Sequence, residues 1–318
     1  HDELPAPDTK LLFYPDTCSP FLWLQFGLYD SFRYGLLGLR ANAYKELGDY
    51  NKALADLTEL VKSDPFEYAK RGELYLCMRK YLLAIDDFNA CLLDMDKRRK
   101  PADLPEALWQ TQRAGRRAGI YANRAIAYLE LNEYKDAEKD AGRAIQLYES
   151  IPATLSDLRA YAYFVRGLCF THAKEKSKAL ADFSSCIQSN EKLGIFGTAV
   201  FTGANINAKT IHGGAYMNRA SIYYEMHDYQ KASQDYRQAI NLDPNNAELY
   251  CILGKCLLEL GKYDEAKSNL NRAATLAPHA VPVQGRVHMN LGEIYNRSGE
   301  HDKAISEFTK LISLNRTN

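Results

Sequence analysis

The sequence predicts an all-α protein built from about seven helical hairpins stacked in a line. Apolar residues recur at helical spacing, and they fall into paired segments that are separated by short breaks. The pairs share an internal pattern, in which an alanine opens the second helix and a small residue lies in the first. Because one helical hairpin cannot bury its own apolar face, such pairs must stack on one another into a solenoid.

Seven segments carry this pattern at consistent internal spacing. The alanines that open the second helices are Ala53, Ala84, Ala137, Ala179, Ala232, Ala266 and Ala304. The small residues of the first helices are Ala41, Gly72, Ala125, Gly167, Ala220, Gly254 and Gly292. Four positions after each alanine lie Leu57, Phe88, Ala141, Phe183, Tyr236, Leu270 and Phe308. Successive alanines are 31, 53, 42, 53, 34 and 38 residues apart, so three junctions depart far from the regular period.

The best-defined hairpin runs from Tyr250 to Pro278. Its two periodic segments meet at Gly261-Lys262, and Pro278 ends the second helix because proline has no N–H to continue it. This hairpin resembles the tetratricopeptide repeat, a helix-turn-helix unit of about 34 residues. The resemblance covers about residues 34–315. It implies a right-handed superhelical solenoid with a concave groove built from the first helices.

The elements are expected in a simple order along the chain. Residues 1–33 form an extended N-terminal arm and a capping helix, since a long aromatic-rich helix from Phe21 to Leu47 runs into the first repeat. The repeats span about residues 34–65, 66–96, 118–149, 160–191, 213–244, 247–278 and 285–315. Insertions of residues 97–117 and 192–212 follow the second and the fourth repeat.

The two insertions differ in character. Asp103, Pro105 and Glu106 mark a helix start, so the first helix of repeat three is expected to be lengthened over Leu104–Leu131. The segment Leu193–Gly214 is rich in glycine and has no helical period. Because loops of this length are uncommon inside a compact array, the segment is either a spacer or a flap folded over the groove.

The composition argues against several classes of partner. Forty basic and 40 acidic residues give a net charge of zero, which disfavours nucleic acid or an anionic membrane as the main partner. No apolar run is long enough to span a membrane. The basic run Lys97–Lys100, with Arg113, Arg116 and Arg117, fits a nuclear-import or phosphate-binding patch or, more simply, a solvated surface.

The seven cysteines bear on the cellular compartment. Most occupy small-residue repeat positions and are expected to be buried in a reducing environment, which favours the cytoplasm. The chain begins at His1, so a processed secreted or periplasmic form is also open. Cys169 and His172 lie one helical turn apart, but no second pair accompanies them, and we expect no metal site and no cofactor.

Arginine and aspartate recur together in five repeats. The pairs are Arg40 with Asp56, Arg71 with Asp87, Arg124 with Asp140, Arg166 with Asp182, and Arg219 with Asp235. In repeat six Leu253 and Asn269 replace both members, as an ion pair between the two helices predicts. Repeat seven has Leu291 and Glu307, which leaves its pairing open. A forked arginine–carboxylate contact would set the angle between the helices of each hairpin.

The groove implied by the resemblance carries candidate binding residues. Asn123, Asn218 and Asn290 precede the arginine position in repeats three, five and seven, where family members commonly hold a peptide backbone with an asparagine. The alternative is an asparagine that bonds locally within its own helix. Apolar anchors for a partner are expected from Ile126, Leu129, Tyr161, Phe164, Leu168, Met217 and Tyr224.

Family members that bind acidic chaperone tails add basic residues to the same groove. The corresponding positions around Asn123 hold Ala69, Glu73, Tyr161 and Val165, and none of them is basic. The sequence therefore argues against binding of an acidic C-terminal tail.

The leading functional prediction is a protein-interaction adaptor that holds an extended peptide or an amphipathic helix of a partner in its groove. Two alternatives remain open: a structural subunit that uses the insertions and outer edges, and a regulatory domain of a larger protein. No zinc-protease, serine-hydrolase or phosphate-loop motif is present, so we expect no enzyme activity. The sequence does not identify the partner or the oligomeric state.

Overall fold

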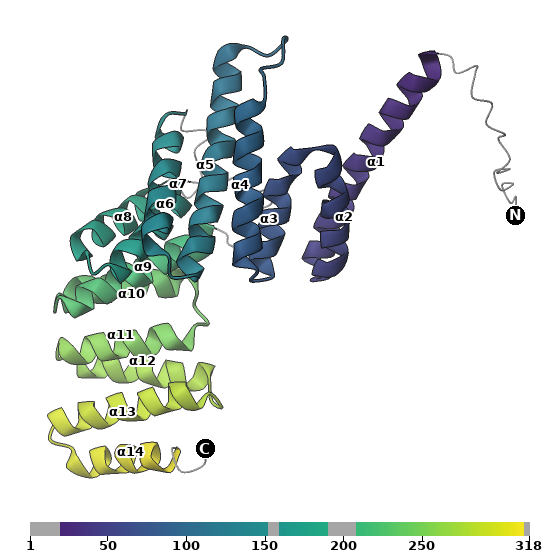
Figure 1. Ribbon diagram of the computed structural model, residues 1–318. Coiled ribbons are helices and arrows are strands. Elements are labelled where there is room, and N and C mark those ends of the chain that lie inside the picture. Colours follow the sequence, from purple (N-terminus) through teal and green to yellow (C-terminus); the bar gives the residue numbers. More distant parts are fainter. Residues whose placement is uncertain (1–19, 152–158, 190–207, 315–318) are drawn as a thin grey trace, which may run out of the picture. The chain divides into compact units, whose positions relative to one another are not determined.

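The computed structural model describes residues 20–151, 159–189 and 208–314 (Figure 1). Every regular element among these residues is a helix, which confirms the all-α prediction. The chain divides into two compact units, residues 1–67 and 68–318, and each is described by itself. Residues 1–19 of the expected N-terminal arm and most of the glycine-rich segment after repeat four lie outside the described residues.

Unit 1 holds one helical hairpin. Its helices are α1 (Pro20–Glu46) and α2 (Tyr50–Ser63), followed by the short 3-10 helix η1 (Pro65–Glu67). The long helix α1 agrees with the helix predicted from Phe21 to Leu47. Ala41 of α1 and the buried face of α2, which includes Ala53, Leu57 and Leu60, form the core of this hairpin.

Unit 2 holds six further hairpins, here numbered 2 to 7 along the chain. Their helices are α3 (Tyr68–Cys77) with α4 (Tyr81–Lys97), α5 (Glu106–Glu130) with α6 (Tyr134–Glu149), α7 (Arg159–His172) with α8 (Lys176–Gln188), α9 (Ala208–Glu225) with α10 (Tyr229–Leu242), α11 (Ala247–Glu259) with α12 (Tyr263–Leu276), and α13 (Val281–Arg297) with α14 (His301–Leu314). Consecutive helices pack on one another throughout this series.

Two helix starts refine the expected insertions. Helix α5 begins at Glu106, so part of the predicted insertion 97–117 is the lengthened first helix of hairpin 3. Helix α9 begins at Ala208, whereas the sequence predicted no helical period before Gly214. The difference has a packing reason: Ile211 and Ala215 are buried one turn apart against α7 and α8, and this tertiary burial overrides the low helix propensity of Gly213 and Gly214.

All seven hairpins turn in the same way. The residue five positions before the reference alanine has φ between 57° and 77°, at Gly48, Arg79, Asn132, Lys174, His227, Gly261 and Gly299. The next backbone N–H then donates to the carbonyl five residues earlier at 2.8–2.9 Å, as from Glu175 to Phe170. This is the hydrogen bond of a Schellman motif, which satisfies a free carbonyl at the end of the first helix.

The small residue of each first helix sets how closely the second helix approaches. A Cβ at Gly72 or Gly167 would lie 2.8 Å or 2.7 Å from the ring of Phe88 or Phe183, both fully buried. Glycine is therefore paired with a large side chain, whereas Ala125 faces the small Ala141. This volume matching holds for the glycine-containing repeats and for repeat three, whereas Ala220 with Tyr236 departs from it.

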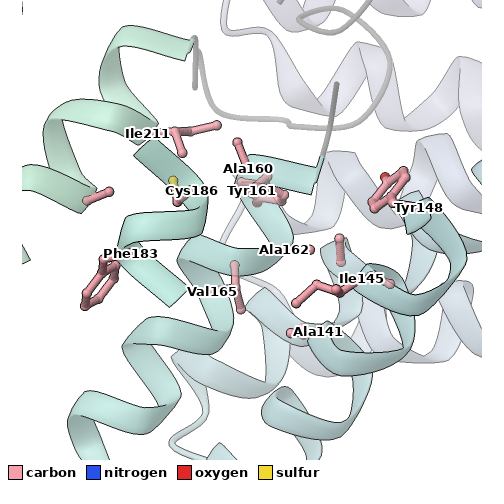
Figure 2. Packing of buried hydrophobic residues seen from close by; sticks show 14 of the residues in the cluster. Ala141, Ile145, Tyr148, Ala160, Tyr161, Ala162, Val165, Phe183, Cys186 and Ile211 are labelled. Carbon is pink, nitrogen blue, oxygen red and sulfur yellow. The ribbon is translucent and has the colours of Figure 1, made fainter. Parts of the chain in front are cut away.

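Two clusters of buried residues run from α5 to α13 in the part of unit 2 that the structure describes. The first joins hairpins 3 and 4 to α9, and the second joins hairpins 5 and 6 to α13. Figure 2 shows part of the first cluster, with Ala141, Ile145 and Tyr148 from α6, Ala160, Tyr161, Ala162 and Val165 from α7, Phe183 and Cys186 from α8, and Ile211 from α9. Helix α9 contributes side chains to both clusters.

Candidate functional site

The first helices of hairpins 2 to 5 are neighbours in unit 2. Helix α3 contacts α5, α5 contacts α7, and α7 contacts α9. We call the surface that these helices form together the first-helix face. The predicted binding residues Asn123, Ile126, Leu129, Tyr161, Phe164, Leu168, Met217, Asn218 and Tyr224 all belong to α5, α7 and α9.

Asn123 lies beneath this face rather than on it. Its side chain is 1% exposed, and its amide nitrogen donates to the Glu73 carboxylate of α3 at 3.4 Å. Its amide oxygen is buried without a hydrogen-bond partner among the described residues. An asparagine that bonds across hairpins in this way matches neither of the two alternatives considered from the sequence. Any peptide-binding role for it stays a prediction.

Glu73 and Tyr161 complete a buried polar group around Asn123. The Glu73 side chain is 4% exposed and that of Tyr161 is 5% exposed. Burial raises the pKa of the Tyr161 phenol, and the charge of the nearby Glu73 raises it further. The group therefore combines a carboxylate, an amide and a neutral phenol. It contains no cationic side chain that could bind an acidic ligand.

The apolar residues on the face are only partly covered. Ile126 of α5 and Leu168 of α7 occupy the same repeat position, and both are half-buried. Met217 of α9 is more open, at 38% exposed. Phe164 is used differently, because its ring packs against the backbone of α9, where a Cβ at Gly214 would lie 3.0 Å from it. Ile126, Leu168 and Met217 therefore keep exposed apolar surface, and so does Leu129 of α5, which is also half-buried.

The remaining predicted residues differ from one another. The amide of Asn218 donates to the carbonyl of Gly214 at 2.8 Å, which is the local bond expected under the alternative interpretation. Asn290 is buried in hairpin 7. Tyr224 contacts the edge of the Tyr229 ring and lies beneath the ammonium of Lys255. Burial raises the pKa of Tyr224 to about 12. One repeat position thus gives different surroundings for each asparagine.

The five arginines are held by the five aspartates. In each hairpin from 1 to 5 the guanidinium donates through Nε and Nη2 to both carboxylate oxygens, with distances between 2.6 and 2.9 Å. All five aspartates are buried. In unit 2 each of these arginines also lies 5.2–5.9 Å from the centre of one or two aromatic rings of its own helix. The fork and the rings together fix the orientation of the arginine.

Two arginines also bind the preceding hairpin, a contact that the sequence analysis missed. Arg124 donates to Asn89 of α4, and Arg219 donates to Ser184 of α8 at 2.9 Å. Asn89 and Ser184 both lie five positions after the reference alanine of their repeat. The sequence therefore contained a sign of this contact, a polar residue that recurs at one repeat position. The equivalent residue before Arg166 is Gly142, which has no side chain to accept such a bond.

Hairpins 6 and 7 replace the ion pair in different ways. Asn269 donates to the carbonyl of Glu265 one turn earlier in its own helix. Glu307 instead bonds to His288 and Lys310, each at 2.6 Å. Partial burial acts to raise the pKa of Glu307, but the hydrogen bonds from Lys310 and His288 outweigh it and leave the pKa below its ordinary value.

The cysteines and histidines form no metal-binding group in the described part of the chain. Cys169 is buried, and burial raises its pKa to about 12. His172 is exposed and stacks on the ring of Tyr134 at 4.3 Å. Within the same described residues no helix has both the length and the apolar character to cross a membrane.

Comparison with known families decides the identity of the fold. Models of the tetratricopeptide repeat (TPR) match residues 34–67, 122–189 and 257–317. A further TPR model matches residues 220–261. The chain belongs to the tetratricopeptide repeat family. The matched segments span hairpins 1 and 3 to 7, which confirms the resemblance seen in the sequence.

Relatives and a solved structure agree with this assignment. The chain is 23% identical to human mitochondrial import receptor subunit TOM70 over 87% of its length and 40% of that protein. It is 29% identical to the Hsp70/Hsp90 co-chaperone CNS1 of Saccharomyces cerevisiae over 31% of its length and 25% of that protein. The C-terminal part of a TPR protein from Cytophaga hutchinsonii shares the fold, with a TM-score of 0.58, 14% identity, and coverage of 88% of this chain and 96% of that one. The chain thus spans less than half of the length of either curated relative.

Proposed function

We propose that this TPR chain is a non-enzymatic protein-interaction adaptor that holds an apolar segment of a partner on its first-helix face. The observation that carries the proposal is the row of incompletely covered apolar side chains at Ile126, Leu168 and Met217, on three helices that are neighbours. An amphipathic helix or an extended segment with one or two apolar anchors would cover this row. The similarity to an import receptor and a co-chaperone supports a protein as the partner.

The same face is unsuited to an acidic chain terminus. A carboxylate brought to the position of Asn123 would meet the Glu73 carboxylate, to which the amide nitrogen of Asn123 already donates. Like charges in a poorly hydrated site repel strongly, and no basic residue occupies the neighbouring positions Ala69, Tyr161 and Val165 to offset the repulsion. We therefore infer apolar recognition rather than recognition of a terminal carboxylate.

A matched pair of methionine variants tests the proposal. Peptides that bind the whole chain are selected from a random display library, and their affinities are measured by fluorescence anisotropy. Met217→Glu should weaken the selected peptides by about tenfold or more, because it places a charge where an apolar anchor is expected. Met226→Glu is the control, since Met226 is also exposed but lies in the turn after α9, away from the row.

Two results would overturn this assignment. If both variants weaken the peptides equally, or neither does, the first-helix face is not the binding surface. A synthetic peptide with an acidic, free C-terminus is expected to bind no better than its glutamine analogue. Clear preference for the acidic peptide would show that the charge argument at Glu73 is wrong.

A further inference from the structure

The connection between α4 and α5 forms a second exposed surface. Helix α5 has 25 residues, and its N-terminal half pairs with the end of α4 through Arg113 and Arg117, which both donate to Asp96. Figure 1 shows these two helix ends rising beyond the neighbouring helices of unit 2. We call residues 93–108 the hairpin tip. They share no residue with the first-helix face.

The hairpin tip and the adjoining turns of α5 are positively charged on a chain that is neutral overall. Residues 94–117 contain seven basic and four acidic residues, a net charge of +3. Asp94 is bound by Arg98, and Asp96 is shared by two arginines. Lys97 and Arg99 are exposed, and neither has an ion-pair partner among the residues that the structure describes. The tip therefore keeps cationic groups available to a partner.

Apolar side chains accompany this charge. Leu93 at the end of α4 is 62% exposed, and Leu108 in the first turn of α5 is 43% exposed. Single exposed leucines are common on protein surfaces. Two of them on the paired ends of α4 and α5, on either side of Lys97 and Arg99 in the sequence, give the tip both an apolar and a cationic component.

We propose that the hairpin tip is a docking surface for an acidic, leucine-containing segment of a partner protein. Arginine and lysine recognise carboxylates directly, arginine through two parallel hydrogen bonds. A membrane or a nucleic acid fits less well. Either would present a continuous negative surface to Asp103 and Glu106 as well as to the cations. Separate carboxylates on a protein segment can contact the cations and avoid these acidic residues.

The test uses the full chain and a fluorescent amphipathic peptide with glutamates on one helical face and two leucines one turn apart. The wild-type chain should bind it, and the affinity should fall severalfold when the salt concentration rises from about 50 to about 300 mM. Lys97→Glu combined with Arg99→Glu should weaken binding by about tenfold or more. Lys135→Glu combined with Lys139→Glu, an equal charge change on exposed positions of α6, is the control and should change binding by less than about threefold.

The outcomes separate the possible partners. Binding that the tip variant loses and the control keeps supports the proposal, provided that circular dichroism shows both variants folded. Absence of binding by the wild type, or equal binding by the tip variant, overturns it. Tighter binding to vesicles containing phosphatidylserine, or to single-stranded DNA, also overturns it in favour of another class of ligand. Met217→Glu distinguishes the two surfaces: loss of binding in this variant, with binding kept in the tip variant, would place the peptide on the first-helix face and would overturn the proposal.

Discussion

Replacing Arg166 with leucine should destabilise hairpin 4 through the carboxylate that it leaves behind. In the native protein both oxygens of Asp182 accept hydrogen bonds from the guanidinium, at 2.7 and 2.8 Å. The Asp182 side chain is only 6% exposed, so water cannot replace those bonds once the arginine is removed.

The burial of the Arg166–Asp182 pair determines how much unfolding free energy the Arg166→Leu variant loses. Exposed ion pairs contribute about 0–1 kcal/mol, whereas removal of one partner from a buried pair costs about 3–5 kcal/mol. Because 26% of the Arg166 side chain is exposed, we expect the lower end of that range, about 3 kcal/mol. The double variant Arg166→Leu with Asp182→Asn copies the residues that hairpin 6 uses at Leu253 and Asn269. It leaves no buried charge and should cost only about 1 kcal/mol.

Urea unfolding followed by circular dichroism measures the loss of unfolding free energy in the single and in the double variant. Because repeat arrays need not unfold in one step, hydrogen exchange in α7 and α8 should be followed as well. The single variant should therefore lose about 2 kcal/mol more than the double variant. Arg40→Leu provides a matched control with a smaller loss, since 58% of the Arg40 side chain is exposed. Equal losses in the single and double variants of hairpin 4 would refute the coupling of Arg166 to Asp182.

Three further predictions follow from the repeat geometry. Gly142→Ser should stabilise the chain by about 1 kcal/mol in urea unfolding, because it removes a helical glycine and places a hydroxyl beside Arg166; a loss of stability would contradict this. Lys174→Gly should raise stability by about 0.5–1 kcal/mol, because Lys174 has φ 60° in an exposed turn; an unchanged midpoint would argue against strain there. Since the pKa of Glu307 lies below 4.5, its stabilising contribution is complete above that pH and is lost as the pH falls through the lowered value. Glu307→Gln should remove this acid-dependent change, measured as hydrogen exchange in α14 against pH, and the same pH dependence in the variant would exclude Glu307 as its source.

The repeated pattern predicted the hairpins because the contacts that hold each hairpin together lie within it and recur from one hairpin to the next. Gly167 against Phe183 needs only the two helices of one hairpin, and so does Arg166 beside Asp182. The spacing within a repeat is enough to predict such contacts. The turn at Gly261 was also predictable, since glycine tolerates a positive φ.

Most of the features that the sequence did not predict depend on a neighbouring hairpin. Asn123 is buried because Glu73 of the preceding hairpin lies beside it, and an internal repeat does not say which side chains will meet across a junction. The bond from Arg219 to Ser184 has the same origin. Lys174 and His227 adopt a positive φ because their place in the turn outweighs the strain in a residue with a side chain. The start of α9 was misplaced because burial of Ile211 outweighed local composition.

Helix α9 belongs to two packing clusters at once. It gives Ile211, Ala215 and Ile222 to the cluster of hairpins 3 and 4, and Ala220 to the cluster that continues to α13. A partner seated on Met217 would therefore contact α9, which both clusters share. Binding there would restrain α9 in both clusters at once, so that contact at one side chain would reduce the motion of hairpins 3 and 4 and of hairpins 5 and 6 together.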